Sequence, residues 1–85
     1  MTLVIKMSKN GKFSHILAVK RLADFLREYR VKNNITREEL ANLTDISPRY
    51  IADLENCEKK ISVEYLAKIK NAIDIDVNYI LTGNI

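Results

Sequence analysis

The chain has 85 residues, of which 47% are hydrophobic and 29% charged, and its formal net charge is +3 at pH 7. A chain of this length forms one domain, able to bury about 60–65% of the surface of its unfolded state, and no apolar run approaches the roughly 20 residues of a membrane span. A single cysteine excludes an internal disulfide, and with a single histidine it makes no zinc quartet. We therefore expect a cytoplasmic protein without a cofactor.

Residues 1–20 are interpreted as an N-terminal extension, in which short apolar runs flank the pair Asn10 and Gly11. Asn-Gly between apolar runs is the strongest short-range signal for a β-hairpin. We predict strands over residues 2–9 and 12–17, lying on the helical body or pairing with another subunit, because two strands alone are marginally stable in water. A frayed arm is the alternative. The apolar stretch is too short and too lysine-rich for a secretory signal.

The helical domain is predicted over residues 21–85, with its first helix over about 19–33. Leu22, Leu26 and Tyr29 recur there at i, i+4 and i+7, which places them on one inward face of a helix.

Two short helices joined by a tight turn are predicted between Thr36 and Asn56. Thr36 caps the first helix, and Glu39 closes a capping box three residues on. Ser47 caps the second, with Pro48 at the first helical position, where its missing N–H is not needed. Helices that share so short a turn cross steeply, and one projects its amino end from the surface. That geometry suits insertion of a helix into the major groove of DNA.

Apolar spacing assigns the faces of these two helices. Leu40, Ala41 and Leu43 form the apolar side of the first helix, whereas Ile51 and Leu54 face inward on the second. The outward positions of the second helix are Pro48, Arg49, Ala52 and Asp53.

Two further helices complete the predicted all-α fold. Ser62 caps one of them, Asp76 caps the other, and Gly83 ends the chain's last helix. The residues expected to face inward on the helix after Ser62 are Val63, Leu66, Ile69 and Ile73. The fold class is therefore a five-helix domain preceded by the predicted hairpin.

The segment from Thr36 to Asn56 resembles the helix-turn-helix of the phage repressor and Cro family. The positions that match the family's pattern are Thr36, Glu38 to Ala41, Ile46, Ser47, Tyr50, Ile51, Leu54, Glu55 and Asn56. The resemblance extends from about Leu22 to Gly83. It implies a repressor-like domain that binds double-stranded DNA as a homodimer, with the helix after Ser47 as the recognition helix.

The chain departs from the family's pattern at three positions. Arg37 replaces a glutamine that binds phosphate in the resembled family, so we expect Arg37 either to bind phosphate or to lie on a solvated face. Asp45 replaces a turn glycine and must adopt a left-handed conformation, which Asp tolerates better than most residues. Cys57 replaces the glycine after the recognition helix and is interpreted as a plain small residue or, alternatively, a redox sensor.

Five residues of the recognition helix are candidates for DNA contact. Arg49 can pair bidentately with guanine, or be a solvated or phosphate-binding arginine. Ser47 and Tyr50 can bond phosphate or a base edge, although Tyr50 can also pack beside the preceding helix. Pro48 offers only an apolar contact, for example to a thymine methyl group. Asp53 can accept from a cytosine amino group, or repel phosphates and pair locally.

The residues after the recognition helix are expected to hold the DNA backbone. Asn56, Lys59 and Lys60 stand where relatives contact phosphates, and such contacts position a protein without carrying sequence information. The resemblance also implies an internal ion pair between Arg30 and Glu55, which ties the first helix to the end of the recognition helix.

The leading hypothesis is a sequence-specific DNA-binding transcriptional regulator, more readily a repressor than an activator. Two copies would meet half-sites one helical turn apart. The apolar surfaces available for the homodimer are Tyr79, Ile80, Leu81 and the hairpin. No nucleophile–base pair, phosphate-binding glycine loop or metal cluster suggests an enzyme, and no small-molecule substrate or membrane partner is evident.

The alternative hypothesis is a protein–protein interaction module of the same fold, in which the hairpin adds a strand to a partner's sheet. The uneven charge supports it: residues 1–34 carry +6, residues 35–60 carry −2 and residues 61–85 carry −1. Binding to DNA requires positive potential facing the phosphates, whereas the helix-turn-helix is mildly acidic.

Overall fold

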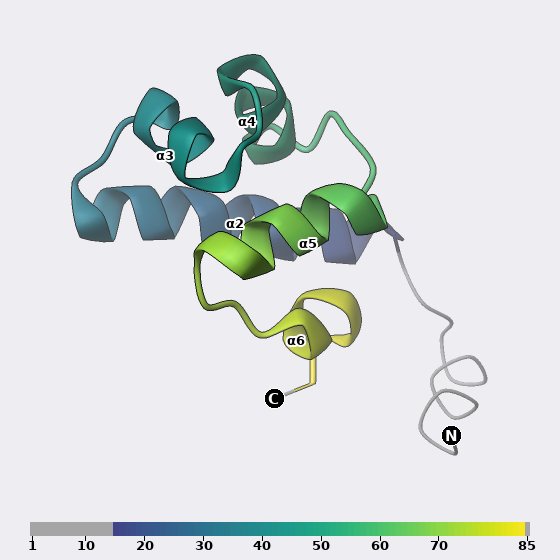
Figure 1. Ribbon diagram of the computed structural model, residues 1–85. Coiled ribbons are helices and arrows are strands. Elements are labelled where there is room, and N and C mark those ends of the chain that lie inside the picture. The colour runs from purple at the N-terminus through teal and green to yellow at the C-terminus, as the bar shows by residue number, and fades with distance from the viewer. Residues whose placement is uncertain (1–14, 85) are drawn as a thin grey trace.

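The computed structural model describes residues 15–84, and Figure 1 shows their arrangement. This part of the chain is all-α, as expected, and contains no strand. Its five helices are α2 (His15–Asn33), α3 (Arg37–Thr44), α4 (Pro48–Glu55), α5 (Val63–Ala72) and α6 (Val77–Thr82). Among them, no helix combines the length and the apolar character that crossing a membrane requires.

The long helix α2 is the support on which the fold is built. Both α4 and α6 pack against α2, and α3 packs against α4 and α5. In Figure 1, α3 and α4 lie above α2, and α6 lies below it. The two helices of the helix-turn-helix, α3 and α4, therefore sit together on one side of α2.

Each of the five helices contributes one large, fully buried apolar side chain to the core. These are Leu26, Leu40, Ile51, Ile69 and Ile80, in chain order from α2 to α6. Burying an aliphatic side chain of this size stabilises a fold by about 1.5–3 kcal/mol. Because the five belong to one cluster, the core itself fixes the position of α4 relative to α2.

The turn between α3 and α4 is built as the sequence predicts. The Thr36 hydroxyl accepts from the Glu39 amide at 3.0 Å, and the Glu39 carboxylate accepts from the Thr36 amide at 2.8 Å. Asp45 ends α3 in the left-handed conformation, with φ of 60°. The Ser47 hydroxyl then accepts from the Tyr50 amide at 3.1 Å and caps α4.

The later helix ends also follow the prediction. Ser62 caps α5 and Asp76 caps α6, each through its side-chain oxygen. Gly83 ends α6 with φ of 80°, and a Cβ atom there would lie 2.6 Å from a terminal nitrogen of Arg21. Arg21 in turn donates to the Ile80 carbonyl at 3.1 Å, which fastens α6 to α2.

The boundary of the N-terminal extension is corrected by the structure. Residues 15–17, expected at the end of the second strand, belong to α2, as do residues 18–20, which we placed in the extension. The reason is that Ala18 is buried and lies four residues before Leu22, so the inward face of α2 begins upstream of Val19. The rest of the predicted hairpin, residues 2–14, lies outside the described residues.

Two side chains expected to face inward do not. Val63 is 86% exposed, and Leu43 is also exposed. Val63 is the first residue of α5, and the inward face of that helix is formed by residues that follow it. Leu43 lies in the last turn of α3, beyond the buried pair Leu40 and Ala41.

Candidate nucleic-acid interface

The amino end of α4 presents Arg49 to solvent. The Arg49 side chain is 86% exposed, and its Nε atom lies 3.6 Å from the Asp53 carboxylate one turn further along the helix. Ser47 and Pro48 beside it are exposed as well. A guanidinium held at an exposed helix end has the reach and the two parallel donors that recognition of guanine requires.

Asp53 differs from the expectation that it faces outward, because its side chain is only 16% exposed. The chain folds back at this end of α4, where the Glu58 amide donates to the Asp53 carbonyl at 2.8 Å. The Asp53 carboxylate pairs with Arg49, so the local ion pair considered for it is present. The placement favours a role in orienting Arg49 over direct contact with a base.

Tyr50 packs against α5, a contact that the sequence did not predict. Its ring stacks on that of Tyr65 with centroids 4.1 Å apart and planes inclined by 23°. The Lys59 ammonium lies 5.5 Å from the Tyr50 ring centroid, within the range of a cation–π contact. Burial raises the pKa of Tyr50, and the negative charges that Tyr65, Asp53 and Glu64 can carry raise it further. Tyr50 is thus a bracing residue between α4 and α5.

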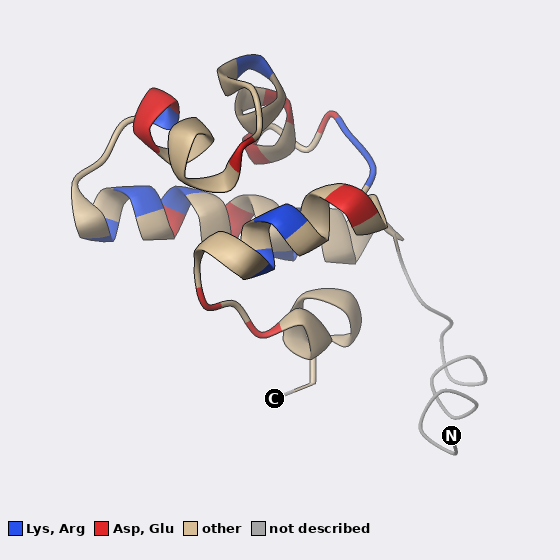
Figure 2. Cartoon of the chain, in the orientation of Figure 1, with Lys and Arg blue, Asp and Glu red and all other residues tan. Residues whose placement is uncertain are grey.

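Asn56, Lys59 and Lys60 are all exposed in the segment that follows α4. Figure 2 shows the basic pair in the loop between α4 and α5. Cys57 lies at the start of this loop with φ of 60°, the backbone conformation that explains why a glycine suits this position. The loop therefore offers two exposed ammonium groups next to α4.

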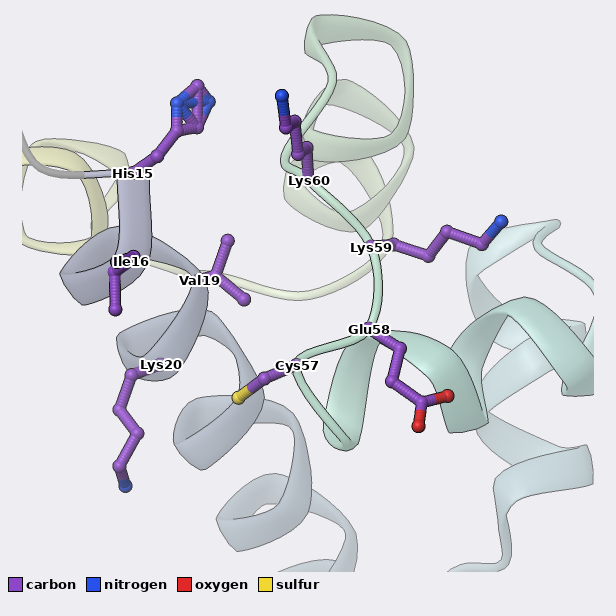
Figure 3. Close-up of a pocket in the computed structure, with 8 residues that line it drawn as sticks. All are labelled: His15, Ile16, Val19, Lys20, Cys57, Glu58, Lys59 and Lys60. Carbon is purple, nitrogen blue, oxygen red and sulfur yellow. The ribbon is translucent and has the colours of Figure 1, made fainter.

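A hollow of about 300 Å³ separates this loop from the start of α2 (Figure 3). Its lining residues are His15, Ile16, Val19, Lys20, Cys57, Glu58, Lys59 and Lys60. In Figure 3, Cys57 points toward α2, whereas Lys59 extends away from it. Lys59 consequently extends toward α4, where it meets the Tyr50 ring, and not toward α2.

The ion pair expected between Arg30 and Glu55 is present at the carboxyl end of α4. Arg30 donates from Nε to Glu55 Oε2 at 2.6 Å and from a terminal nitrogen to Oε1 at 2.9 Å. The Glu55 side chain is fully buried, so this bidentate contact joins α2 to α4 inside the protein. The hydrogen bond to Glu55 raises the pKa of Arg30.

Arg37 completes this cluster, a role that the sequence did not reveal. Its Nε atom donates to Glu55 Oε1 at 3.1 Å, while the side chain remains 43% exposed. Burial alone would raise the pKa of Glu55, but hydrogen bonds from Arg30 and Arg37 and their positive charges hold it below its ordinary value. Arg27 adds a bond from its guanidinium to the Glu55 carbonyl at 2.5 Å.

Three arginines from α2 and α3 thus converge on the last residue of α4. Arg27 and Arg30 are three residues apart in α2, and this spacing was a readable sign of a shared face. No such sign exists for Arg37, which is 18 positions from Glu55 and reaches it only through the fold.

The chain is similar to known proteins that contain a helix-turn-helix. A family model described as helix-turn-helix matches residues 26–80. The control protein C.SmaI of Serratia marcescens is 31% identical over 61 residues, which make up 72% of this chain and 73% of that protein.

Solved structures of similar fold include the clp gene regulator ClgR from Corynebacterium glutamicum. One crystal structure of that regulator has a TM-score of 0.62 and 31% identity, and the alignment covers 79% of this chain and 71% of the other. A second has a TM-score of 0.62 and 33% identity, and covers 75% and 83% of the two chains.

Proposed function

The chain belongs to the helix-turn-helix family and is a DNA-binding transcriptional regulator, and from this premise we propose that it is a homodimeric repressor that reads an operator through α4. The observation that carries the proposal is the exposed Arg49 guanidinium at the amino end of α4. Ser47 and Pro48 flank it and are equally accessible. In this arrangement Arg49 reads a guanine, and its neighbours contribute a phosphate or base-edge bond and an apolar contact.

Phosphate contacts come from residues on both sides of α4. Asn56, Lys59 and Lys60 follow the helix, and Arg37 precedes it at the start of α3. Such contacts set the register of the protein on the duplex and supply affinity that depends on salt. Part of the acidic charge of the helix-turn-helix is neutralised inside the protein, because Glu55 is buried and bonded to Arg30 and Arg37.

A homodimer follows from the small number of base contacts that one α4 can make. Two copies related by a two-fold axis would meet half-sites one helical turn apart, which doubles those contacts. Of the apolar residues considered for the interface, Tyr79 is exposed on α6, whereas Ile80 is buried in the core. Tyr79 and the partly exposed Leu81 are therefore the α6 residues available to a second copy.

Selection of bound fragments from a random pool of duplex DNA tests this proposal most directly. The expected result is a two-fold symmetric sequence whose half-sites are one helical turn apart. With that operator, Arg49→Ala should relax the preference at one base position in each half-site, by about 1–3 kcal/mol. Equal weakening on every sequence would refute base reading by Arg49.

The salt dependence of binding to random DNA separates DNA binding from the alternative of a protein-interaction module. Affinity should fall steeply with salt, and Lys60→Ala should reduce the log–log slope by about one. Lys70→Ala is a matched control, because Lys70 bonds Asp74 and the Ile75 carbonyl at the far end of α5. Absence of salt-dependent binding would favour the interaction module.

Repression is tested with a reporter gene whose promoter overlaps the selected operator. The wild-type protein should lower expression, and Arg49→Ala should restore it. Increased expression from the same promoter would identify an activator and contradict this part of the proposal.

A further inference from the structure

The charges at the carboxyl end of α4 do not balance within the cluster. Glu55 is one buried carboxylate, and it accepts hydrogen bonds from two guanidinium groups, those of Arg30 and Arg37. Arg30 binds it bidentately and is mostly covered, with a side chain 19% exposed. Arg37 binds it through Nε alone. Of the two guanidinium groups bonded to the carboxylate, one positive charge is therefore in excess, and Arg37 is the more exposed of the two.

The excess positive charge of Arg37 faces solvent at the amino end of α3. Arg37 is the first residue of α3, where unpaired backbone N–H groups and the helix dipole also favour a negative charge. An arginine has five N–H donors, of which the bond to Glu55 uses one. Its terminal nitrogens have no hydrogen-bond partner among residues 15–84. The exposed side of the guanidinium is thus left to bind an anion from solution.

We propose that Arg37 is a bridging residue: it holds Glu55 through Nε and a DNA phosphate through its terminal nitrogens at the same time. This inference rests on the proposed function and deepens it. A phosphate bound by Arg37 is connected through two hydrogen bonds to the last residue of α4. The DNA backbone then sets the angle at which α4 enters the groove, and Arg37 is a specificity-determining as well as an affinity-determining residue.

The length of α4 explains how a contact at one end affects reading at the other. The helix has 8 residues, with Arg49 at its amino end and Glu55 at its carboxyl end. An eight-residue helix is about 12 Å long, so rotating the domain on the duplex about a phosphate held beside Glu55 displaces Arg49 across the base edges. Bidentate pairing with guanine requires both donors of a planar fork in register. A small change of tilt therefore lowers discrimination more than it lowers general affinity.

The lysines of the loop after α4 lack this connection. Lys60 is exposed and bonded to no residue of α4, and Lys59 contacts α4 only through the face of the Tyr50 ring. A phosphate bound by Lys60 positions the protein without adjusting the tilt of α4. Lys60→Ala is consequently the matched comparison for the variants of Arg37. Each substitution removes a proposed phosphate contact, but only Arg37 is bonded to Glu55.

The test measures, for each variant, the dissociation constant for the selected operator and for operators with one base changed at the position read by Arg49, over a range of salt. Arg37→Lys keeps the positive charge but replaces the planar fork with one flexible ammonium, which does not hold Glu55 and a phosphate in a fixed relative geometry. It should retain the wild-type salt slope and lose about five- to tenfold of the discrimination between operators. Arg37→Gln should lose the same discrimination and about one unit of slope.

Lys60→Ala should lose about one unit of slope and keep the wild-type discrimination. In a Glu55→Gln background, Arg37→Lys should no longer change the discrimination, because the bridge has lost its inner anion. All measurements are made below the unfolding transition of each variant, followed by circular dichroism, and Arg37→Lys in the wild-type background suffices if Glu55→Gln does not fold.

Two results overturn the bridge: unchanged discrimination in Arg37→Lys, or uniform weakening by Arg37→Gln as in Lys60→Ala. Both can occur while the wild-type protein still binds and reads DNA, so they leave the proposed function standing. Failure of the wild-type protein to bind DNA would instead remove the proposed function and the bridge with it.

Discussion

Cys57 occupies a backbone position that few side chains tolerate. Its φ is 60°, and it begins the loop that carries Lys59 and Lys60 away from α4. A left-handed conformation costs a residue with a Cβ atom roughly 1–2 kcal/mol, and no glycine relieves that cost here. The loop nevertheless forms because the amides of Cys57 and Glu58 bond carbonyls of α4.

Replacing Cys57 with glycine should therefore stabilise the protein. The relief of left-handed strain exceeds the extra entropy that glycine gives the unfolded chain, for a net gain of up to about 1 kcal/mol. Urea unfolding of Cys57→Gly against wild type measures it. Cys57→Ala, which keeps a Cβ atom and loses the thiol, should unfold like the wild type, and a gain in Cys57→Ala as large as that in Cys57→Gly would show that strain is not the cause.

Residue roles were predictable where they depend on neighbours in the chain or on a family resemblance. The left-handed Asp45 follows from the turn glycine that it replaces in the resembled pattern, and the Arg30–Glu55 pair follows from the same resemblance. The bond from Arg37 to Glu55, the stack of Tyr50 on Tyr65 and the covering of Asp53 arise from contacts between helices. Such contacts leave no periodic trace in a sequence.

At the scale of elements, the helices of residues 15–84 owe their boundaries to local hydrogen bonds. The four N-caps are Thr36, Ser47, Ser62 and Asp76, and all four were predictable because a capping side chain bonds an amide three residues away. The start of α2 was not predictable, since it depends on Ala18 being buried by other helices. Capping hydrogen bonds thus define the starts of α3, α4, α5 and α6, whereas packing against other helices defines the start of α2.

The cap of α4 provides a prediction at this scale. Ser47→Ala removes the bond from the Ser47 hydroxyl to the Tyr50 amide and should lower the free energy of unfolding by about 1 kcal/mol. Ser62→Ala removes the equivalent bond at α5 and should cost a similar amount. Urea denaturation gives both values.

The two serine variants should differ in DNA binding at a temperature where both are folded. Ser47 lies at the amino end of α4, whereas Ser62 lies at the start of α5, so we expect the larger loss of operator affinity in Ser47→Ala. An unchanged unfolding free energy in Ser47→Ala would show that the cap contributes nothing to α4.

At the scale of the whole molecule, Glu55 connects stability to pH. Its pKa in the folded protein lies below the ordinary value of 4.5, because Arg30 and Arg37 outweigh the effect of burial. A lowered pKa adds stability that is fully present above the pKa of the unfolded state. That stability is lost as the pH falls through the lower pKa of the folded state. The protein should therefore lose stability below about pH 4.5.

Urea unfolding at a series of pH values between about 3 and 7 measures this loss. Carboxylates titrate within this range. Glu55→Gln should flatten the acid dependence, and at neutral pH it should lower the unfolding free energy by up to about 3–5 kcal/mol, since it leaves the mostly covered Arg30 without its buried anion. Glu58→Gln, a change of the same kind at an exposed loop residue, should keep the wild-type dependence. Identical pH profiles for the two variants would contradict the assignment to Glu55.

The attachment of α6 to α2 also has a consequence for synthesis. Ile80 fills the core beside Leu22 and Leu26, and Arg21 donates to the Ile80 carbonyl across 59 positions of the chain. Until α6 leaves the ribosomal tunnel, α2 keeps apolar side chains exposed to water. The nascent chain must therefore wait for residues 77–82 before it closes, and a stall in translation just before them would yield a product prone to chaperone capture or proteolysis.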